Sequence, residues 1–233
     1  MSGDLRHAAA SAAVRGLARK ALGQIGTARR SFLDGIEYAT RSNSDLERAR
    51  LLICLGWLEL DSAVVEGGKS GRKPLEYFTE ARGFARHVGD AFYEFDAQLG
   101  CVWSALANDD LSFAVEATNS IPRNYGEELP GYLELGLAAA RGSVALTASD
   151  FAGASLQFSR VIDHVSGKQG CSLWKSVGLI GVGSLEWHSG NRQKAEAAWN
   201  QARSTGRSHS PFRARVVDAS ITRCRASATE PPH

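Results

Sequence analysis

Among the places where a small residue is followed four positions later by a large aromatic residue, four lie about 40 residues, or about twice that distance, apart. These pairs are Ala28 and Phe32, Pro74 and Phe78, Ala154 and Phe158, and Ala195 and Trp199. Because residues four apart share one face of an α-helix, the small residue lets a neighbouring helix approach while the aromatic ring fills the space beside it. The pattern recurs about every 40 residues, a period typical of helical repeats. We therefore expect a stack of helix pairs.

Hydrophobic residues follow helical periodicity almost throughout, and the alternation typical of strands is nearly absent. The pattern predicts helix pairs at residues 4–22 with 25–41, 45–64 with 73–88, 90–107 with 110–120, 129–148 with 150–165, and 172–188 with 191–205. Ser210 and Pro211 predict the start of a further helix, because Ser is a good cap and Pro suits the first turn. Such a helix would cover the open end of the stack.

The polar residues in the breaks are suited to cap the helices that follow them. The expected caps and helix starts are Ser44 with Asp45, Asp90, Asp109, Ser149 with Asp150, and Ser210, while Gly190 and Asn191 separate two helices. The resulting organisation is a repeat domain over residues 1–209, a capping helix over 210–226 and a flexible tail over 227–233.

Within the pairs, the residues resemble the tetratricopeptide repeat. That family places a Gly or Ala in the first helix, a small residue twelve positions later, an aromatic after four more, and another small residue three beyond. The matching sets are Gly16, Ala28, Phe32 and Gly35; Gly142, Ala154, Phe158 and Val161; and Gly183, Ala195, Trp199 and Ala202. The second repeat keeps Gly56 and Phe78 but carries an insertion at residues 67–73, and the third keeps Gly100 without the aromatic.

The resemblance implies an all-α fold, a right-handed superhelix of about five antiparallel helix pairs followed by the capping helix. The stretch of residues 85–90 resembles the join between repeats of about 40 residues in bacterial signalling regulators. In this family the first helices line a concave groove. The positions that correspond to the groove are Arg50, Ile53, Trp57, Asp61, Glu94, Cys101, Ser184, Trp187 and His188. Trp57 and Trp187 would anchor a partner there, or else pack between helices.

Charge and cysteine content restrict the partners. The net charge is +2, but acidic residues dominate positions 90–134 and basic residues dominate both ends, an asymmetry that would also allow self-association. The basic C-terminal segment holds only Phe212 as an aromatic, so stacking on nucleic acid is poorly supported. The four cysteines match no zinc spacing, which favours reduced thiols and a cytoplasmic location. We find no apolar run long enough to span a membrane.

Two glycine-rich patterns have simpler explanations than nucleotide binding. Residues 63–70 satisfy a relaxed phosphate-loop pattern, but they follow a helical segment instead of a strand. Gly178, Gly181 and Gly183 lie in a helical pattern, which indicates close packing. We assign no catalytic, cofactor-binding or metal-binding residues.

We therefore expect a scaffold that binds a protein or peptide segment in its groove. One alternative is a regulatory sensor domain that binds a small molecule or a signal peptide. Another is an enzyme built on the helical scaffold, with His188, Asp61 and Glu94 as the first polar groups to test.

Overall fold

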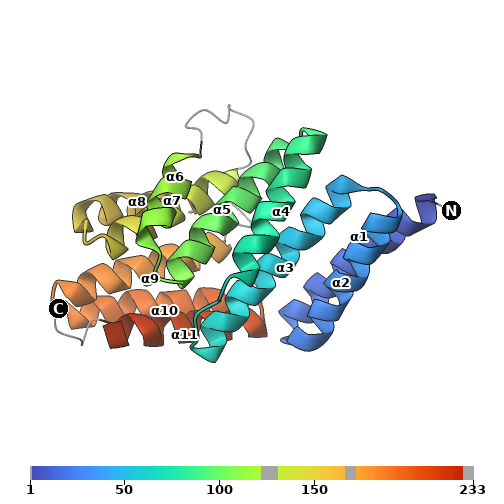
Figure 1. Ribbon diagram of the computed structural model, residues 1–233. Coiled ribbons are helices and arrows are strands. Elements are labelled where there is room, and N and C mark those ends of the chain that lie inside the picture. Colours follow the sequence, from blue (N-terminus) through green and yellow to red (C-terminus); the bar gives the residue numbers. More distant parts are fainter. Residues whose placement is uncertain (1, 122–130, 166–171, 228–233) are drawn as a thin grey trace. The chain divides into compact units, whose positions relative to one another are not determined.

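The computed structural model describes residues 2–121, 131–165 and 172–227, and these residues form helices joined by short connections (Figure 1). The helices are α1 (Ser2–Ala21), α2 (Ile25–Arg41), α3 (Asp45–Glu66), α4 (Lys73–Val88), α5 (Ala91–Ala107), α6 (Leu111–Asn119), α7 (Gly131–Thr147), α8 (Phe151–Val165), α9 (Ser172–His188), α10 (Arg192–His209) and α11 (Pro211–Ser227). The described part of the chain contains no strand, so the all-α prediction is confirmed.

The predicted helix bounds agree with the observed ones to within a few residues. The largest difference is at α10, which continues to His209 instead of ending at residue 205. Residues 129 and 130, expected to begin a helix, lie outside the described residues, as do residues 228–233 of the expected tail. Within each part of the chain that the structure describes, helices that follow one another pack together, for example α1 with α2, α4 with α5, α7 with α8 and α9 with α10, which is compatible with a helical repeat.

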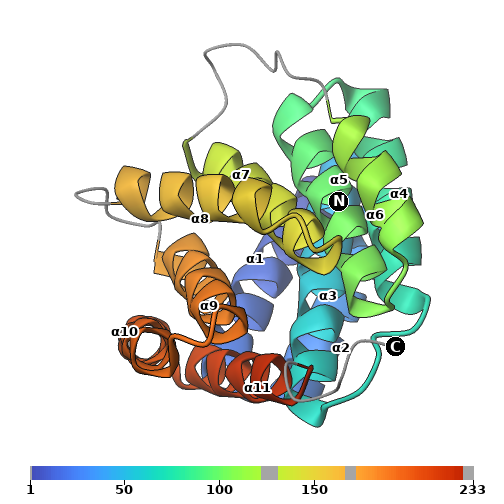
Figure 2. The ribbon, with the colours of Figure 1, turned by 90° about the vertical axis from the view of Figure 1, so that its left-hand side faces the viewer.

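The chain divides into two compact units. The first comprises Met1–Ala63 and Gly68–Ile121, and the second comprises Val64–Gly67 and Pro122–His233. In the second unit, α11 packs on α9 and α10, as Figure 2 shows. Its buried residues Val217 and Ile221 join a hydrophobic cluster with Trp199 of α10. The predicted final helix is therefore present and covers part of this core.

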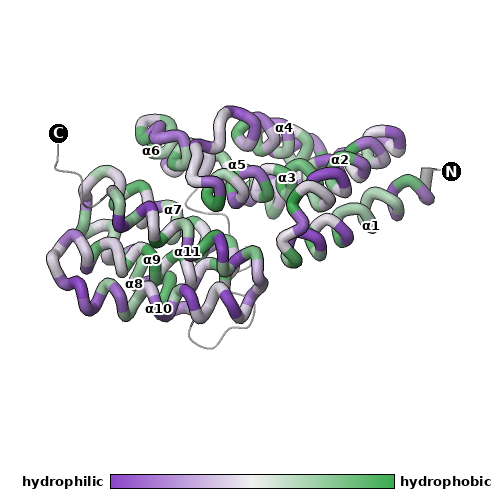
Figure 3. The backbone as a smooth tube through the Cα atoms, turned by 90° about the horizontal axis from the view of Figure 1, so that it is seen from below, coloured by the Kyte–Doolittle hydropathy of each residue, from purple (hydrophilic) through white to green (hydrophobic). Residues whose placement is uncertain are grey.

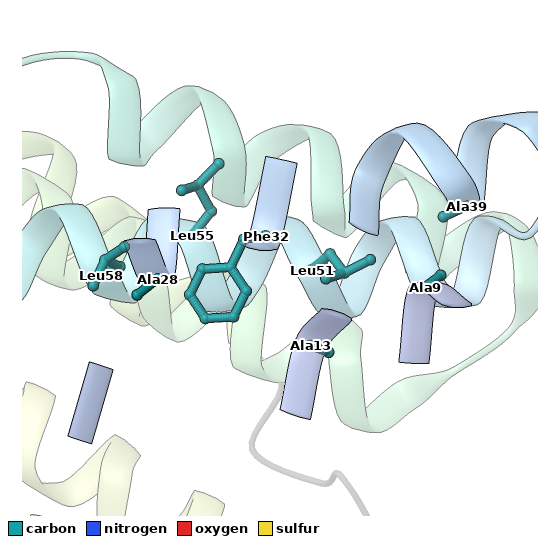
Figure 4. Packing of buried hydrophobic residues seen from close by; sticks show 8 residues of the cluster. All are labelled: Ala9, Ala13, Ala28, Phe32, Ala39, Leu51, Leu55 and Leu58. Atoms are coloured by element: carbon teal, nitrogen blue, oxygen red, sulfur yellow. The ribbon is translucent and has the colours of Figure 1, made fainter. Parts of the chain in front are cut away.

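One hydrophobic cluster of the first unit combines alanines of α1 and α2 with Phe32 of α2 and leucines of α3 (Figure 4). Phe32 of α2 is fully buried between Ala13 of α1 and Leu55 of α3. A Cβ atom on Gly16 of α1 would lie 2.3 Å from the Phe32 ring, so the ring occupies the space that a larger residue would need. This contact explains why a glycine stands at position 16 of α1, opposite Phe32.

The same aromatic contact occurs further along the chain and joins successive helices. Phe78 of α4 lies over Gly56 of α3 and Gly100 of α5, where added Cβ atoms would approach the ring to 2.6 and 2.3 Å. The third predicted repeat has no aromatic at the expected position, and its Gly100 accommodates the ring of the preceding helix.

The second unit uses aromatic rings and glycines in the same way. Phe158 of α8 lies over Gly142 of α7 and Gly181 of α9, and Trp199 lies over Gly183. An added Cβ atom would come within 2.7, 2.4 and 2.2 Å of these rings. Close helix packing therefore accounts for the glycines of α9, as the sequence indicated.

Side-chain caps begin several helices at the predicted residues. The carboxylate of Asp90 accepts a hydrogen bond from the Tyr93 backbone N–H at 2.9 Å, and that of Asp150 accepts one from Gly153 at 2.9 Å. One prediction was wrong by a residue: Asp110, not Asp109, caps α6 by accepting from the Phe113 N–H at 3.0 Å. Asp109 instead has a left-handed backbone, with φ of 62°, and belongs to the turn.

The insertion before α4 is held on the turn between α5 and α6. The Asn108 amide donates to the backbone carbonyls of Gly71 and Ser104, at 2.9 and 2.8 Å, and accepts from the Gly71 N–H at 3.0 Å. Lys69 pairs with Asp109 at 2.9 Å. The segment follows α3 and no strand, so it lacks the context of a phosphate loop.

Candidate partner-binding face

The nine predicted groove residues come from three helices in two units. Arg50, Ile53, Trp57 and Asp61 lie on α3, Glu94 and Cys101 on α5, and Ser184, Trp187 and His188 on α9. Those on α3 and α5 belong to the first unit and those on α9 to the second.

Three of the nine side chains are buried. Ile53 and Cys101 are 3% and 4% exposed and belong to the hydrophobic cluster around Phe78. Ser184 is 4% exposed, and its hydroxyl donates to the Ile180 carbonyl at 2.9 Å. These side chains serve helix packing and offer almost no surface to a partner, so the prediction depends on the other six.

Trp57 is half-buried and connects two helices. Its ring packs edge-on against Phe78, with centroids 5.3 Å apart, and its indole Nε1–H donates to a carboxylate oxygen of Asp96 on α5 at 3.2 Å. The residue therefore combines an anchoring role between α3 and α5 with a partly exposed surface.

Lys20, at the end of α1, contacts α3 through two polar groups. Its ammonium lies 2.7 Å from a carboxylate oxygen of Asp61 and donates to the Trp57 backbone carbonyl at 3.3 Å. Both charged side chains are about one-fifth exposed, at 19% and 18%. Polar contacts through Trp57 thus connect α1, α3 and α5, which are the first helices of the first three predicted helix pairs.

Two titratable groups in this cluster are strongly affected by burial. Burial raises the pKa of the Asp96 carboxyl to about 6, against the lowering effect of the hydrogen bond from Trp57. Burial also raises the pKa of the neighbouring Cys54 thiol to about 11, so this thiol is protonated near neutral pH. Sequence reasoning missed Asp96 and Lys20. The available signal for Asp96 was a carboxylate within the largely apolar α5.

Next to this cluster, an open hollow lies between α1 and α3. It has a volume of about 420 Å³ and is lined by Ala10, Ser11, Val14, Arg15, Ala18 and Arg50. Arg50 was predicted as a groove residue, whereas the residues of α1 were not. Alanines are so frequent on α1 that periodicity alone did not separate its exposed apolar residues from its buried ones.

Glu94 of α5 already has a basic partner. Its carboxylate accepts a hydrogen bond from the Arg86 guanidinium at 2.5 Å, and the Arg86 side chain is 54% exposed. Glu94 therefore presents an ion pair to a ligand instead of an isolated charge.

In the second unit, Trp187 lies between a cation and another indole. The Arg192 guanidinium carbon is 3.6 Å from the Trp187 ring centroid, and the Trp199 ring is 5.2 Å away on α10. The Trp187 Nε1 atom is buried and has no hydrogen-bond partner among the described residues. His188 is exposed, with its ring 5.5 Å from that of Phe151. Trp187 is half-buried, so neither tryptophan is purely core or purely surface.

The described residues contain no cluster of His, Cys, Asp and Glu that could hold a metal ion. Nor does any helix among them have the length and apolar character required to cross a membrane. Comparison of the chain with protein-family models, curated proteins and solved structures gives no match.

Proposed function

We propose that this protein is a tetratricopeptide-like scaffold that binds a protein or peptide segment on the face formed by α1, α3 and α5 of its first unit. The observation that carries the proposal is the open hollow between α1 and α3, which combines apolar side chains with two guanidinium groups. Arg is among the residues enriched at protein interfaces and at their energetic hot spots.

The framework around the hollow supports binding with little reorganisation. Lys20 joins α1 to α3 through Asp61, and Trp57 joins α3 to α5 through Asp96. A site on helices that are held in this way loses little conformational entropy when a partner binds. The partner alone then bears most of the ordering cost.

Site-specific photocrosslinking tests this proposal. A photoreactive residue replaces Val14, which is 60% exposed beside the hollow, or Leu156 of α8, which is 69% exposed in the second unit. We expect protein adducts in lysate from position 14 and not from position 156. Equal adducts at both positions, or none at position 14, would contradict the proposal.

The same preparations separate the two alternatives. Native mass spectrometry of the untreated protein detects a bound small molecule, which would favour a sensor or an enzyme. Of the groups first considered for catalysis, Asp61 and Glu94 are each paired with a cation. His188 lies on α9 in the second unit.

A further inference from the structure

An apolar stripe runs along the side of α1 that faces the hollow. Ala10, Val14 and Ala18 recur every four residues and so share one face of the helix. Val14 is 60% exposed and Leu17, one turn further, is 44% exposed. Figure 3 shows green tones along much of α1. Ala9 and Ala13 lie on the buried side of α1 and pack into the core, so they do not belong to the exposed stripe.

Two guanidinium groups lie beside this stripe. Arg15 is exposed and makes no hydrogen bond or ion pair with the described residues. Arg50 forms a long ion pair with Glu47 on its own helix, at 3.6 Å, beyond hydrogen-bond distance. The other cations near the end of α1 are engaged: Arg19 donates to the Ser31 hydroxyl at 2.7 Å, and Lys20 pairs with Asp61. The charge available to a ligand at the hollow is therefore positive.

We propose that the hollow binds an acidic amphipathic segment of a partner protein, whose apolar side chains cover Val14 and whose carboxylates pair with Arg15 and Arg50. This inference rests on the proposed scaffold function and specifies the chemistry of its partner. The lining from Ala10 to Ala18 extends about 12 Å along α1, at about 1.5 Å per residue, which matches roughly two helical turns of a partner.

The combination of groups distinguishes this partner from other anions. A carboxylate accepts two parallel hydrogen bonds from a guanidinium, so a pair of Arg residues orients a segment as well as attracting it. A polyanion without apolar groups would satisfy the arginines and leave Val14 and Leu17 in water. Because Arg15 is exposed, the electrostatic part of binding weakens as salt screens the charges.

The probe is a fluorescent helical peptide of two to three turns, with Leu on one face and Glu on both flanks. A matched peptide carries Lys in place of each Glu. Fluorescence anisotropy with the full-length protein compares the two peptides at low and high salt. We expect the Glu peptide to bind more than about tenfold tighter than the Lys peptide at low salt, with the difference shrinking at high salt.

Charge reversal locates the site. The double variant Arg15→Glu with Arg50→Glu is expected to weaken the Glu peptide by more than about tenfold and to strengthen the Lys peptide. The matched control reverses Arg30 on α2 and Arg160 on α8, which are exposed and make no ion pair among the described residues. This control has the same net charge and should bind as the original protein does. Thermal melts confirm that both double variants fold.

The outcomes separate this inference from the scaffold proposal. Equal binding of both peptides, or equal weakening by the control, would overturn the acidic partner. If neither peptide binds but position 14 still crosslinks a protein, the acidic-partner inference is overturned and the scaffold proposal remains. Loss of crosslinks at position 14 would overturn the scaffold proposal itself.

Discussion

The indole N–H of Trp57 donates to a carboxylate oxygen of Asp96 across 3.2 Å, and this hydrogen bond joins α3 to α5. Asp96 is half-buried, and this burial raises the pKa of its carboxyl to about 6. A folded protein that holds a proton more tightly than its unfolded chain becomes less stable as that proton is lost. The linkage makes the joint between these helices sensitive to pH.

Asp96→Asn should therefore stabilise the protein in a pH-dependent manner. The folded pKa of about 6 lies above the unfolded value of 3.8, so the Asp96 contribution to stability is complete below the lower value and is lost as pH rises to the upper one. The Asn variant keeps an oxygen acceptor for Trp57. Its free energy of unfolding, relative to that of the original protein, should rise by about 2 to 3 kcal/mol between these two pH values. Urea unfolding at a series of pH values measures the gain. A difference that does not change with pH would contradict the prediction; Asp34→Asn on the exposed side of α2 is the control.

Gly100→Ala should destabilise the first unit by about 2 to 4 kcal/mol, because its Cβ overlaps a buried ring. The new atom would lie 2.3 Å from Phe78, which is fully buried. Gly83→Ala, on α4 with no atom within 4 Å, should instead stabilise by about 0.5 to 1 kcal/mol through helix propensity. Denaturant titrations distinguish the two. In a Phe78→Leu background, which removes the ring, Gly100→Ala should cost less stability than it does in the original protein. An equal cost in both backgrounds would show that the steric explanation is wrong.

Replacing each half-buried tryptophan by Phe should have unequal effects. Trp57→Phe removes the hydrogen bond from the indole N–H to the half-buried Asp96 carboxylate, whereas Trp187→Phe removes an Nε1 atom that has no partner among the described residues. The first change should cost about 1 to 3 kcal/mol more than the second. Unfolding free energies of the two variants provide the measurement. Equal losses would mean that ring volume, not the N–H group, determines the effect.

The ion pair of Lys20 and Asp61 should be worth about 1 kcal/mol in a double-mutant cycle, because both side chains are partly shielded from solvent. The reference is Arg41 with Glu37, a pair at 3.6 Å whose side chains are 58% and 69% exposed. That pair should give a coupling energy near zero. Both cycles are measured by unfolding at low and high salt. A coupling for Lys20 and Asp61 no larger than that of the reference would show that they do not hold α1 on α3.

Residue spacing was enough to predict most helices and several of their ends. The apolar period sets where a helix can form, and local caps such as Asp90 and Asp150 act within three residues of themselves. The start of α6 is the exception. Asp109 and Asp110 are the same residue type, and only the backbone conformation of the turn determines which of them caps α6.

Spacing also predicted that aromatic rings would fill the space beside small residues, since both lie at fixed intervals along their helices. It did not predict that Phe78 would contact Gly100, because that contact depends on how one helix pair stacks on the next. The candidate site shows the same limit. The resemblance to the tetratricopeptide repeat selected Arg50, but it could not separate the buried Ile53 from the half-buried Trp57 on the same helix.

Asp96 and Lys20 emerged only when the chain was folded. Their partners, Trp57 and Asp61, are 39 and 41 residues distant in sequence and are reached through helix stacking. Helices form from contacts a few residues apart, so their positions can be read along the chain. The pairing of charges, the burial of Asp96 and the hollow beside Arg50 depend on long-range packing, for which a single sequence carries no comparable local signal.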